Sequence, residues 1–354
     1  MRRTIIFGTL LALAFSPIAS CGDSADVGEV GVGAKGQARG KLAAILARGE
    51  LSCGVSGELP GFSFVDKNGD YSGLDVDICR AIAAALFDDP NKVEYRNLNA
   101  KERFTAVQTG EIDILSRNTT WSLSRDTSVG LEFAPVVFYD SQGLMVRSAN
   151  GIKQLSDLKN KSICIQIGTT TEQNLTDQMR QRNIPFKPLV FEDVNTVFGT
   201  YAEGRCDAVT ADRSHLISRR LKLPNPQEHQ ILDTALSKEP LAPAVTDGDS
   251  QWQDTVKWVI YGLLEAEELG VTQANLEQQL KSSDPTVKRL LGTEGTLGKD
   301  MGLTNDFIAR MIRHVGNYGE IYDRNLGPKT PMNLPRGQNK LWRDGGLMYA
   351  PPIR

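Results

Sequence analysis

Short apolar runs alternate with longer segments of helical periodicity through the middle of the chain. Segment 75–87 predicts a helix, because Leu74, Ile78, Ile82 and Leu86 recur every four residues. Further helices are expected at 171–181, 253–268 and 304–315. The runs that predict strands are 51–55, 92–96, 111–115, 142–147, 162–167, 187–191, 207–211 and 229–232. Because strands and helices alternate, the pattern predicts an α/β fold with parallel sheets covered by helices.

Two segments with the same order of elements lie 94 residues apart, FTAVQTGEIDILSRN at 104–118 and FGTYAEGRCDAVTAD at 198–212. Each predicts a helix, then a glycine, then a strand. The offset aligns Asp113 with Asp207, although so common an order of elements can also match by chance. Our interpretation is two similar α/β lobes.

The repeat also predicts a ligand site. In open α/β sheets, ligands bind at the carboxyl ends of strands where the strand order reverses. Asn118 and Asp212, which the same offset aligns, both lie just past a predicted strand. If the two lobes face each other, Arg125 and Asp212 bracket a common cleft.

The N-terminus is different in kind from the rest of the chain. Arg2 and Arg3 precede an apolar stretch and then small residues, so 1–20 is predicted to be a secretory signal peptide, too short for a bilayer span. The segment 18–21 resembles a bacterial lipobox, which predicts lipid attachment at Cys21; soluble export with an incidental cysteine is the alternative. Residues 21–40 are predicted to be a flexible tether.

Composition and charge narrow the class of protein. The chain has 354 residues, enough for two domains, and its 40% hydrophobic content, 23% charged content and net charge of -3 are those of an ordinary soluble globular protein. That charge offers no attraction for nucleic acid or an anionic membrane. Only 3 histidines are present, which argues against a His-rich metal site. No cofactor is expected.

Four cysteines remain after Cys21 in an oxidising compartment, and they allow three pairings. We favour the pairs that are near in sequence, Cys53 with Cys79 and Cys164 with Cys206, which place one disulfide in each lobe. Four free buried thiols are the alternative.

Arg125 ends a hydroxyl-rich run, RNTTWSLSR at 117–125. A guanidinium presents a rigid fork that matches two carboxylate oxygens, and Thr120 adds a hydroxyl donor to the same anion. A solvated loop arginine is the alternative. In GTTTE at 168–172, Thr170 stands at a predicted helix start, which suits an anion as well, with simple N-capping as the alternative.

Asp212 supplies the opposite charge. It follows an apolar strand, where a carboxylate needs a partner, and a ligand ammonium would provide one. An ion pair with Arg213 or a helix cap is the alternative. A carboxylate site together with an ammonium site describes an α-amino acid.

With these residues in place, residues 48–354 resemble the periplasmic polar amino-acid binding proteins of ABC importers, and within them the general L-amino-acid binding subgroup. The motifs that carry the resemblance are GLDVDICRAIAAAL at 73–86, RNTTWSLSR, GTTTE, GRCDA and SKEPL at 237–241. The resemblance implies a two-lobed fold with lobe one at 41–146 and 242–354, lobe two at 147–241, and hinge strands near 142–147 and 239–245. Closure around a ligand would be a hinge motion.

The resemblance also implies a role for each site residue. Arg125, Thr120 and Thr170 match the groups that bind the ligand carboxylate, while Asp212 and the main chain of Asn118 match those that bind the ammonium.

The resemblance leaves alternatives open at several neighbouring positions. Phe62 and Trp121 are candidate pocket walls, with a core role as the alternative for Phe62, and Leu59 stands where many relatives have an aromatic residue. Arg103 and Arg117 are adjacent to the site in sequence. We expect both at the surface, and binding of a ligand side-chain carboxylate is the alternative. No arginine lies near Ser56, where some acidic-amino-acid binders have one, which favours broad specificity.

The expected protein is a monomeric, non-catalytic receptor that delivers L-amino acids to a membrane permease. An enzyme of the dehydratase type on the same fold is an alternative, although Glu58 and Glu172, the nearby candidates for a general acid, have no recognisable partner. An amino-acid-sensing module is the other alternative.

Overall fold

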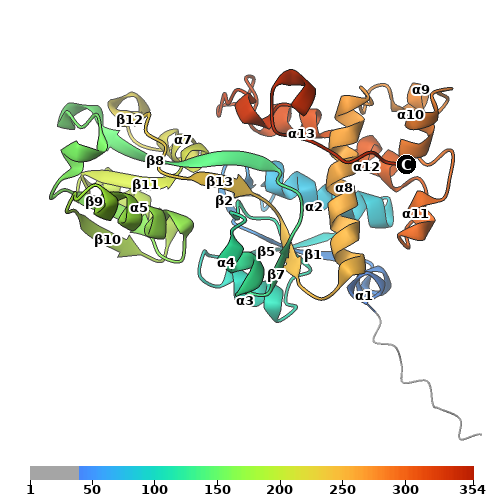
Figure 1. Ribbon diagram of the computed structural model, residues 1–354, viewed down its shortest axis with the longest axis horizontal. Coiled ribbons are helices and arrows are strands. Elements are labelled where there is room, and N and C mark those ends of the chain that lie inside the picture. Colours follow the sequence, from blue (N-terminus) through green and yellow to red (C-terminus); the bar gives the residue numbers. More distant parts are fainter. Residues whose placement is uncertain (1–39) are drawn as a thin grey trace, which may run out of the picture. The chain divides into compact units, whose positions relative to one another are not determined.

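The protein, seen here as a computed structural model, is described over residues 40–354 (Figure 1). The predicted signal peptide at 1–20, the lipid attachment at Cys21 and all but the last residue of the predicted tether lie outside the described residues. Gly40 is the N-cap of the first helix, α1 (Lys41–Arg48).

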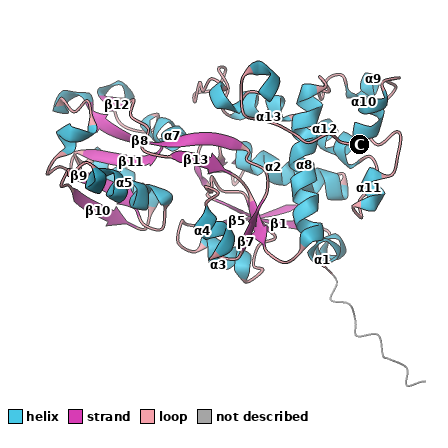
Figure 2. Cartoon of the chain, viewed as in Figure 1, coloured by secondary structure: helices cyan, strands magenta, loops and turns pink. Residues whose placement is uncertain are grey.

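Helices of very different length surround the sheets (Figure 2). The remaining helices are α2 (Leu74–Phe87), α3 (Arg103–Gln108), α4 (Leu123–Thr127), α5 (Thr170–Gln181), α6 (Val194–Ala202), α7 (Arg213–Arg220), α8 (Ser250–Glu268), α9 (Leu276–Gln279), α10 (Pro285–Leu290), α11 (Leu297–Asp300), α12 (Phe307–Val315) and α13 (Tyr318–Asn325).

Two larger sheets organise the chain. The first has the strand order β5 (Val93–Asn97), β1 (Leu51–Val55), β6 (Ile114–Leu115), β14 (Ala244–Thr246), β7 (Leu131–Phe133). The second has the order β10 (Lys187–Phe191), β9 (Ser162–Gln166), β11 (Ala208–Asp212), β8 (Phe138–Arg147), β12 (His229–Ile231), with β13 (Lys238–Leu241) paired to β8. A small sheet joins β2 (Glu58–Leu59), β3 (Ser63–Val65) and β4 (Tyr71–Ser72). We call the parts built on the first and second sheets lobe one and lobe two.

The predicted parallel pairing is present at the centre of both sheets. Strand β1 pairs in parallel with β5 and β6, and β9 pairs in parallel with β10 and β11. Strand β14 joins the first sheet and β8 joins the second in antiparallel orientation. The sequence therefore predicted the central strands correctly and did not predict the orientation of the strands that enter from the other lobe.

Helix α2 confirms the helix that periodicity predicted. Twelve of its residues are buried, including Asp75 and Asp77 in the first turn. It packs with α8 and α12 in one large apolar core that covers the first sheet. Trp252 of α8 is 1% exposed and donates its indole N–H to the carbonyl of Asp113 at 2.9 Å, which fixes α8 against that sheet.

The repeat is realised as matching hydrogen bonds in the two sheets. Asp113 Oδ2 accepts from the backbone N–H of Ser52 at 2.8 Å, and Asp207 Oδ2 accepts from the backbone N–H of Ser162 at 2.9 Å. In each case the aspartate just before one strand holds the start of its parallel neighbour. The two lobes are therefore built on the same local plan.

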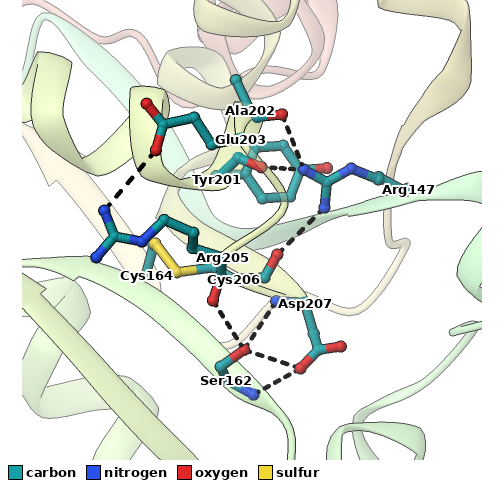
Figure 3. Close-up of a disulfide and its surroundings, with 9 residues drawn as sticks. All are labelled: Arg147, Ser162, Cys164, Tyr201, Ala202, Glu203, Arg205, Cys206 and Asp207. Atoms are coloured by element: carbon teal, nitrogen blue, oxygen red, sulfur yellow. Dashed lines mark hydrogen bonds and ion pairs between the residues drawn. A yellow bond between two sulfur atoms is a disulfide. The ribbon is translucent and has the colours of Figure 1, made fainter.

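Both favoured disulfides are present. Cys53 of β1 is bonded to Cys79 of α2, and Cys164 of β9 is bonded to Cys206, which directly precedes Asp207 (Figure 3). Each bond lies within one lobe, as the sequence predicted.

Two antiparallel strands connect the lobes (Figure 1). The first part of β8, from Phe138 to Ser141, pairs with β13, and its continuation pairs with β11 in the second sheet. The second predicted crossing strand at 239–245 is divided into β13 and β14, with Pro243 between them. Within residues 40–354, no helix combines the length and the apolar character needed to cross a membrane.

Candidate functional site

A polar cavity lies where the carboxyl ends of strands from both sheets meet. Six of the residues around it come from lobe one and nine from lobe two: Ser56, Leu59, Arg103, Arg117, Asn118, Thr120, Gln166, Thr169, Thr170, Thr171, Val194, Phe198, Ala211, Asp212 and His215. The structure thus brings together four residues that the sequence predicted, Asn118, Thr120, Thr170 and Asp212.

The loop after β6 carries the lobe-one side of the cavity. Asn118 adopts a positive φ of 30°, which asparagine tolerates better than most residues. Its backbone N–H donates to Oδ2 of Asp75 at 3.0 Å, so the buried start of α2 fixes the loop. Burial raises the pKa of Asp75 to about 7, although this hydrogen bond and the charge of Arg117 oppose the change.

Arg125 lies immediately behind this loop, in the short helix α4. It is 7% exposed, and Nη1 donates to the carbonyl oxygen of Thr120 at 2.8 Å. Its guanidinium also lies over the ring of Phe104, 5.1 Å from the centroid. Arg125 is not among the residues that line the cavity, and it contacts the cavity residue Thr120 through the backbone. It is a buried residue, which excludes the solvated-loop alternative.

Arg103 and Arg117 are buried in the cavity wall, and our expectation of surface positions for both was wrong. Arg117 donates to the carbonyl of Leu98 at 2.7 Å, and Arg103 donates to the hydroxyl of Thr119 at 3.3 Å, while its Nε has no partner. Burial lowers the pKa of Arg117 to about 10 and holds that of Arg103 well below its usual value. Among residues 40–354, neither forms an ion pair within 4.0 Å, and neither does Arg125.

Asp212 ends β11 and faces these arginines. It is 7% exposed, and neither expected alternative holds in the structure: Arg213 is paired with Asp233 instead, and the Asp212 side chain makes no cap hydrogen bond to α7. Burial raises the pKa of Asp212 well above its usual range, and the charges of Asp140 and Glu239 raise it further. A ligand cation at this carboxylate would relieve that cost of burial.

The N-terminus of α5 supplies the lobe-two hydroxyls. Thr169 is the N-cap, and its Oγ1 accepts from the backbone N–H of Glu172 at 3.3 Å. Because Thr169 performs the capping, the hydroxyl of Thr170 is left for other contacts, and it lies 3.5 Å from the hydroxyl of Thr120 in lobe one. The lobes also meet where Asn195 donates to Glu58 at 2.8 Å and Ser218 donates to the carbonyl of Pro60 at 3.0 Å.

The two aromatic residues named as candidate walls lie outside the cavity lining. Phe62 is 1% exposed and packs edge-on against Phe138, 5.1 Å between centroids, so it takes the core role that was its alternative. Trp121 is 42% exposed and stacks on Phe133. Leu59 and Phe198 provide the apolar wall instead.

Sequence reasoning missed His215 and Phe198 as cavity residues. His215 stands three residues after Asp212, so both face the same side at the start of α7. Burial lowers the pKa of His215 well below its usual value, and the nearby charges of Arg219 and Arg117 lower it further. Within the part of the chain that the structure describes, no group of three or more His, Cys, Asp or Glu side chains is placed to hold a metal ion.

The sequence of the chain matches those of known proteins. The family model for bacterial extracellular solute-binding proteins, family 3, matches residues 51–279. The chain belongs to this family. It is 50% identical over 325 residues to the general L-amino acid-binding periplasmic protein AapJ of Rhizobium johnstonii, with 91% of this chain and 95% of AapJ covered. It is 47% identical over 311 residues to the glutamate/glutamine/aspartate/asparagine-binding protein BztA of Rhodobacter capsulatus, covering 88% and 92%.

A solved structure shares the fold over almost its whole length. The periplasmic binding protein of an ABC transporter from Brucella ovis, with glutathione bound, superimposes with a TM-score of 0.87 at 48% identity and covers 89% of this chain and 99% of that protein. The predicted family and the predicted two-lobed periplasmic binding protein fold are confirmed.

Proposed function

We propose that this family member is the extracytoplasmic substrate-binding component of an ABC importer and binds free L-amino acids in the interlobe cavity. The observation that carries the proposal is that buried charges of both signs lie near one another without forming ion pairs. Asp212 is on one side, and Arg103, Arg117 and Arg125 are on the other. All four are buried, and among the described residues none of them forms an ion pair. A zwitterion would satisfy both signs at once.

Each residue has a role in this proposal. Arg125 with the hydroxyls of Thr120 and Thr170 meets the ligand carboxylate, and Asp212 with the main chain of Asn118 meets the ammonium. AapJ is named as a general L-amino acid-binding protein and BztA as a glutamate/glutamine/aspartate/asparagine-binding protein, which supports an amino acid as the ligand. Because those relatives are binding proteins, they speak against the dehydratase alternative, and Glu172 is occupied locally by the backbone N–H of Gly168.

The cavity wall also indicates which side chains bind well. Arg103 and Arg117 present buried positive charge, and Arg103 retains an unpartnered Nε. We therefore infer that side chains ending in a carboxylate or an amide bind more tightly than apolar ones within a broad range of accepted amino acids.

A second candidate ligand class is a γ-glutamyl peptide such as glutathione. A neighbouring cavity shares Ser56, Arg117, Gln166 and Val194 with the first and continues outward to Asn97 and Asn99, as well as to Leu98, Glu58 and Asp193. A chain attached to the far end of a glutamate side chain would enter that space, and the Brucella relative has glutathione bound.

The proposal also covers the location of the protein, its oligomeric state and its transport partner. We place it in the periplasm as a monomer, with the lobe boundaries predicted above, hinge motion at β8 and β13, and delivery of the closed form to a permease. We further propose a lipid anchor at Cys21. A Cys21→Ser variant should then lose incorporation of labelled palmitate and move from the membrane fraction to the soluble fraction.

A thermal-shift screen tests the main proposal. Twenty amino acids, glutathione, and matched compounds that lack either the amino or the carboxyl group are added to the purified protein. A ligand at a hundred times its Kd stabilises the folded state by about 2.7 kcal/mol, which is a clear shift in Tm. Free α-amino acids should shift Tm and the single-charge compounds should not. Equal shifts with amines or acids alone would contradict zwitterion recognition.

A further inference from the structure

Glu239 occupies the junction between the two lobes and is 1% exposed. Its Oε2 accepts hydrogen bonds from the hydroxyl of Thr120 in lobe one and from the hydroxyl of Thr170 in lobe two, the latter at 3.0 Å. Its Oε1 accepts from Nδ2 of Asn174 at 2.8 Å and from the hydroxyl of Ser237. One buried carboxylate therefore holds side chains from both lobes.

The two threonine hydroxyls are the same groups that the proposed function assigns to the ligand carboxylate. A hydroxyl carries a single proton and can make one strong donation at a time. In this structure both protons are directed at Glu239. A ligand carboxylate that arrives at these hydroxyls must therefore displace Glu239 from them or accept fewer hydrogen bonds.

The charge of Glu239 also competes with that of a ligand carboxylate. Arg125 donates to the backbone of Thr120. Burial lowers the pKa of Arg125, and the negative charge of Glu239 opposes this change more than that of Asp212 does. A ligand carboxylate placed beside Arg125 would share this region with the carboxylate of Glu239. Two like charges at close range in a buried site repel each other strongly.

We propose that Glu239 is an internal competitor for the ligand carboxylate, and that it latches the two lobes together in the absence of ligand by holding Thr120 and Thr170. This inference rests on the proposed function for the identity of the ligand. The latch itself depends only on the contacts of Glu239 with Thr120 and Thr170.

The first test is Glu239→Gln, which keeps the shape of the side chain and removes its charge. Titration calorimetry with glutamate and glutamine should show affinity that is higher by about tenfold, because the repulsion is gone and the two hydroxyls donate less strongly to an amide oxygen than to a carboxylate. Small-angle scattering of the ligand-free variant should show a larger radius of gyration than the wild type. Unchanged or weaker binding would overturn the competitor role, and an unchanged radius of gyration would overturn the latch.

Two further variants separate this mechanism from other effects. Glu239→Asp keeps the charge and shortens the reach to the threonines, so it should also open the ligand-free protein. Asp140→Asn removes a carboxylate from the residue directly opposite Glu239 in β8 without touching the threonines. If Asp140→Asn raises the affinity as much as Glu239→Gln does, a general charge effect replaces the proposal. If wild type and variants bind no amino acid at all, the proposed function fails, while the scattering result still decides on the latch.

Discussion

The hydroxyl oxygens of Thr120 and Thr170 lie 3.5 Å apart, although the two residues belong to different lobes and are separated by 50 positions in the sequence. Residues from both lobes therefore complete the wall of a single cavity when the lobes are in contact. This relationship makes the site sensitive to substitutions on either side of the cavity and gives each of them a distinct expected effect.

Arg125→Ala should weaken amino-acid binding by at least about 1.5 to 3 kcal/mol, because a buried charged hydrogen bond to the ligand carboxylate is lost. Titration calorimetry measures the change. Arg96→Ala is the matched control, since Arg96 is half exposed and forms an ion pair with Glu94 at the surface. An affinity within twofold of the wild type in Arg125→Ala would remove Arg125 from the carboxylate site.

Asp212→Asn should separate stability from function. The variant no longer buries a carboxylate, so the ligand-free protein should have a higher Tm at neutral pH than the wild type. It should also lose most of the ligand-induced Tm shift, because the ammonium loses its counter-ion. A variant that is destabilised and still binds amino acids would contradict both assignments.

The pH dependence of the wild type follows from the same residue. Since burial raises the pKa of Asp212, the carboxylate is increasingly ionised as the pH rises through that raised value. Amino-acid affinity is therefore expected to increase as the pH rises through the raised pKa of Asp212, and Asp212→Asn should flatten this profile. A wild-type affinity that falls over the same range would exclude the ammonium role.

Asp75 is expected to make the stability of the protein depend on pH. Its pKa is about 7 in the folded state and 3.8 as the ordinary value, so the folded state binds more protons between these two pH values. Stability is thus greatest below pH 3.8 for this group and is lost as the pH rises to about 7. At about 1.4 kcal/mol per pKa unit, the loss is of the order of 4 kcal/mol.

Urea unfolding of Asp75→Asn against the wild type at pH 5 and pH 8 measures this effect. Asparagine keeps an oxygen that accepts the N–H of Asn118, so the variant should be more stable than the wild type at pH 8, with a smaller difference at pH 5. Asp70→Asn, at an exposed position, is the control. Parallel pH profiles for Asp75→Asn and the wild type would rule out a buried titration at this site.

The disulfide of lobe two should stabilise that lobe. It closes a sequence separation of 42 residues, for which chain entropy predicts about 3 to 4 kcal/mol. A variant with alanine at Cys164 and Cys206 should lose amide-exchange protection in β9, β10 and β11 before it loses protection in β1 and β5. Equal loss in both sheets would show that the lobes unfold as one unit.

Local signals in the sequence were sufficient for most of the fold. The spacing of Leu74, Ile78, Ile82 and Leu86 predicted α2, because a buried helix repeats its apolar positions at the period of the helix. The strand prediction at 111–115 was too long. Only Ile114 and Leu115 form β6, and Asp113 directly before it holds Ser52 and pairs with Lys41 through its side chain.

The site was less predictable for a different reason. Arg103 and Arg117 were expected at the surface because charged residues are rarely buried without a partner, and the structure buries both beside a ligand cavity. The resemblance placed Glu239 at the start of a hinge strand, but it gave no signal of the contacts with Thr120 and Thr170, which lie 119 and 69 residues away in sequence. Trp121 had the right neighbours in sequence and points away from the cavity lining, toward Phe133.

The two disulfides have a consequence for the order in which the exported chain matures. All four bonded cysteines lie at or before residue 206, whereas β14 and helices α8 to α13, which complete the core of lobe one, come after residue 243. Both bonds can therefore form while the C-terminal third is still being translocated. The two disulfide-bonded segments would then form before the rest of the chain is exported. The pairing of β14 in the first sheet would be the step that completes lobe one.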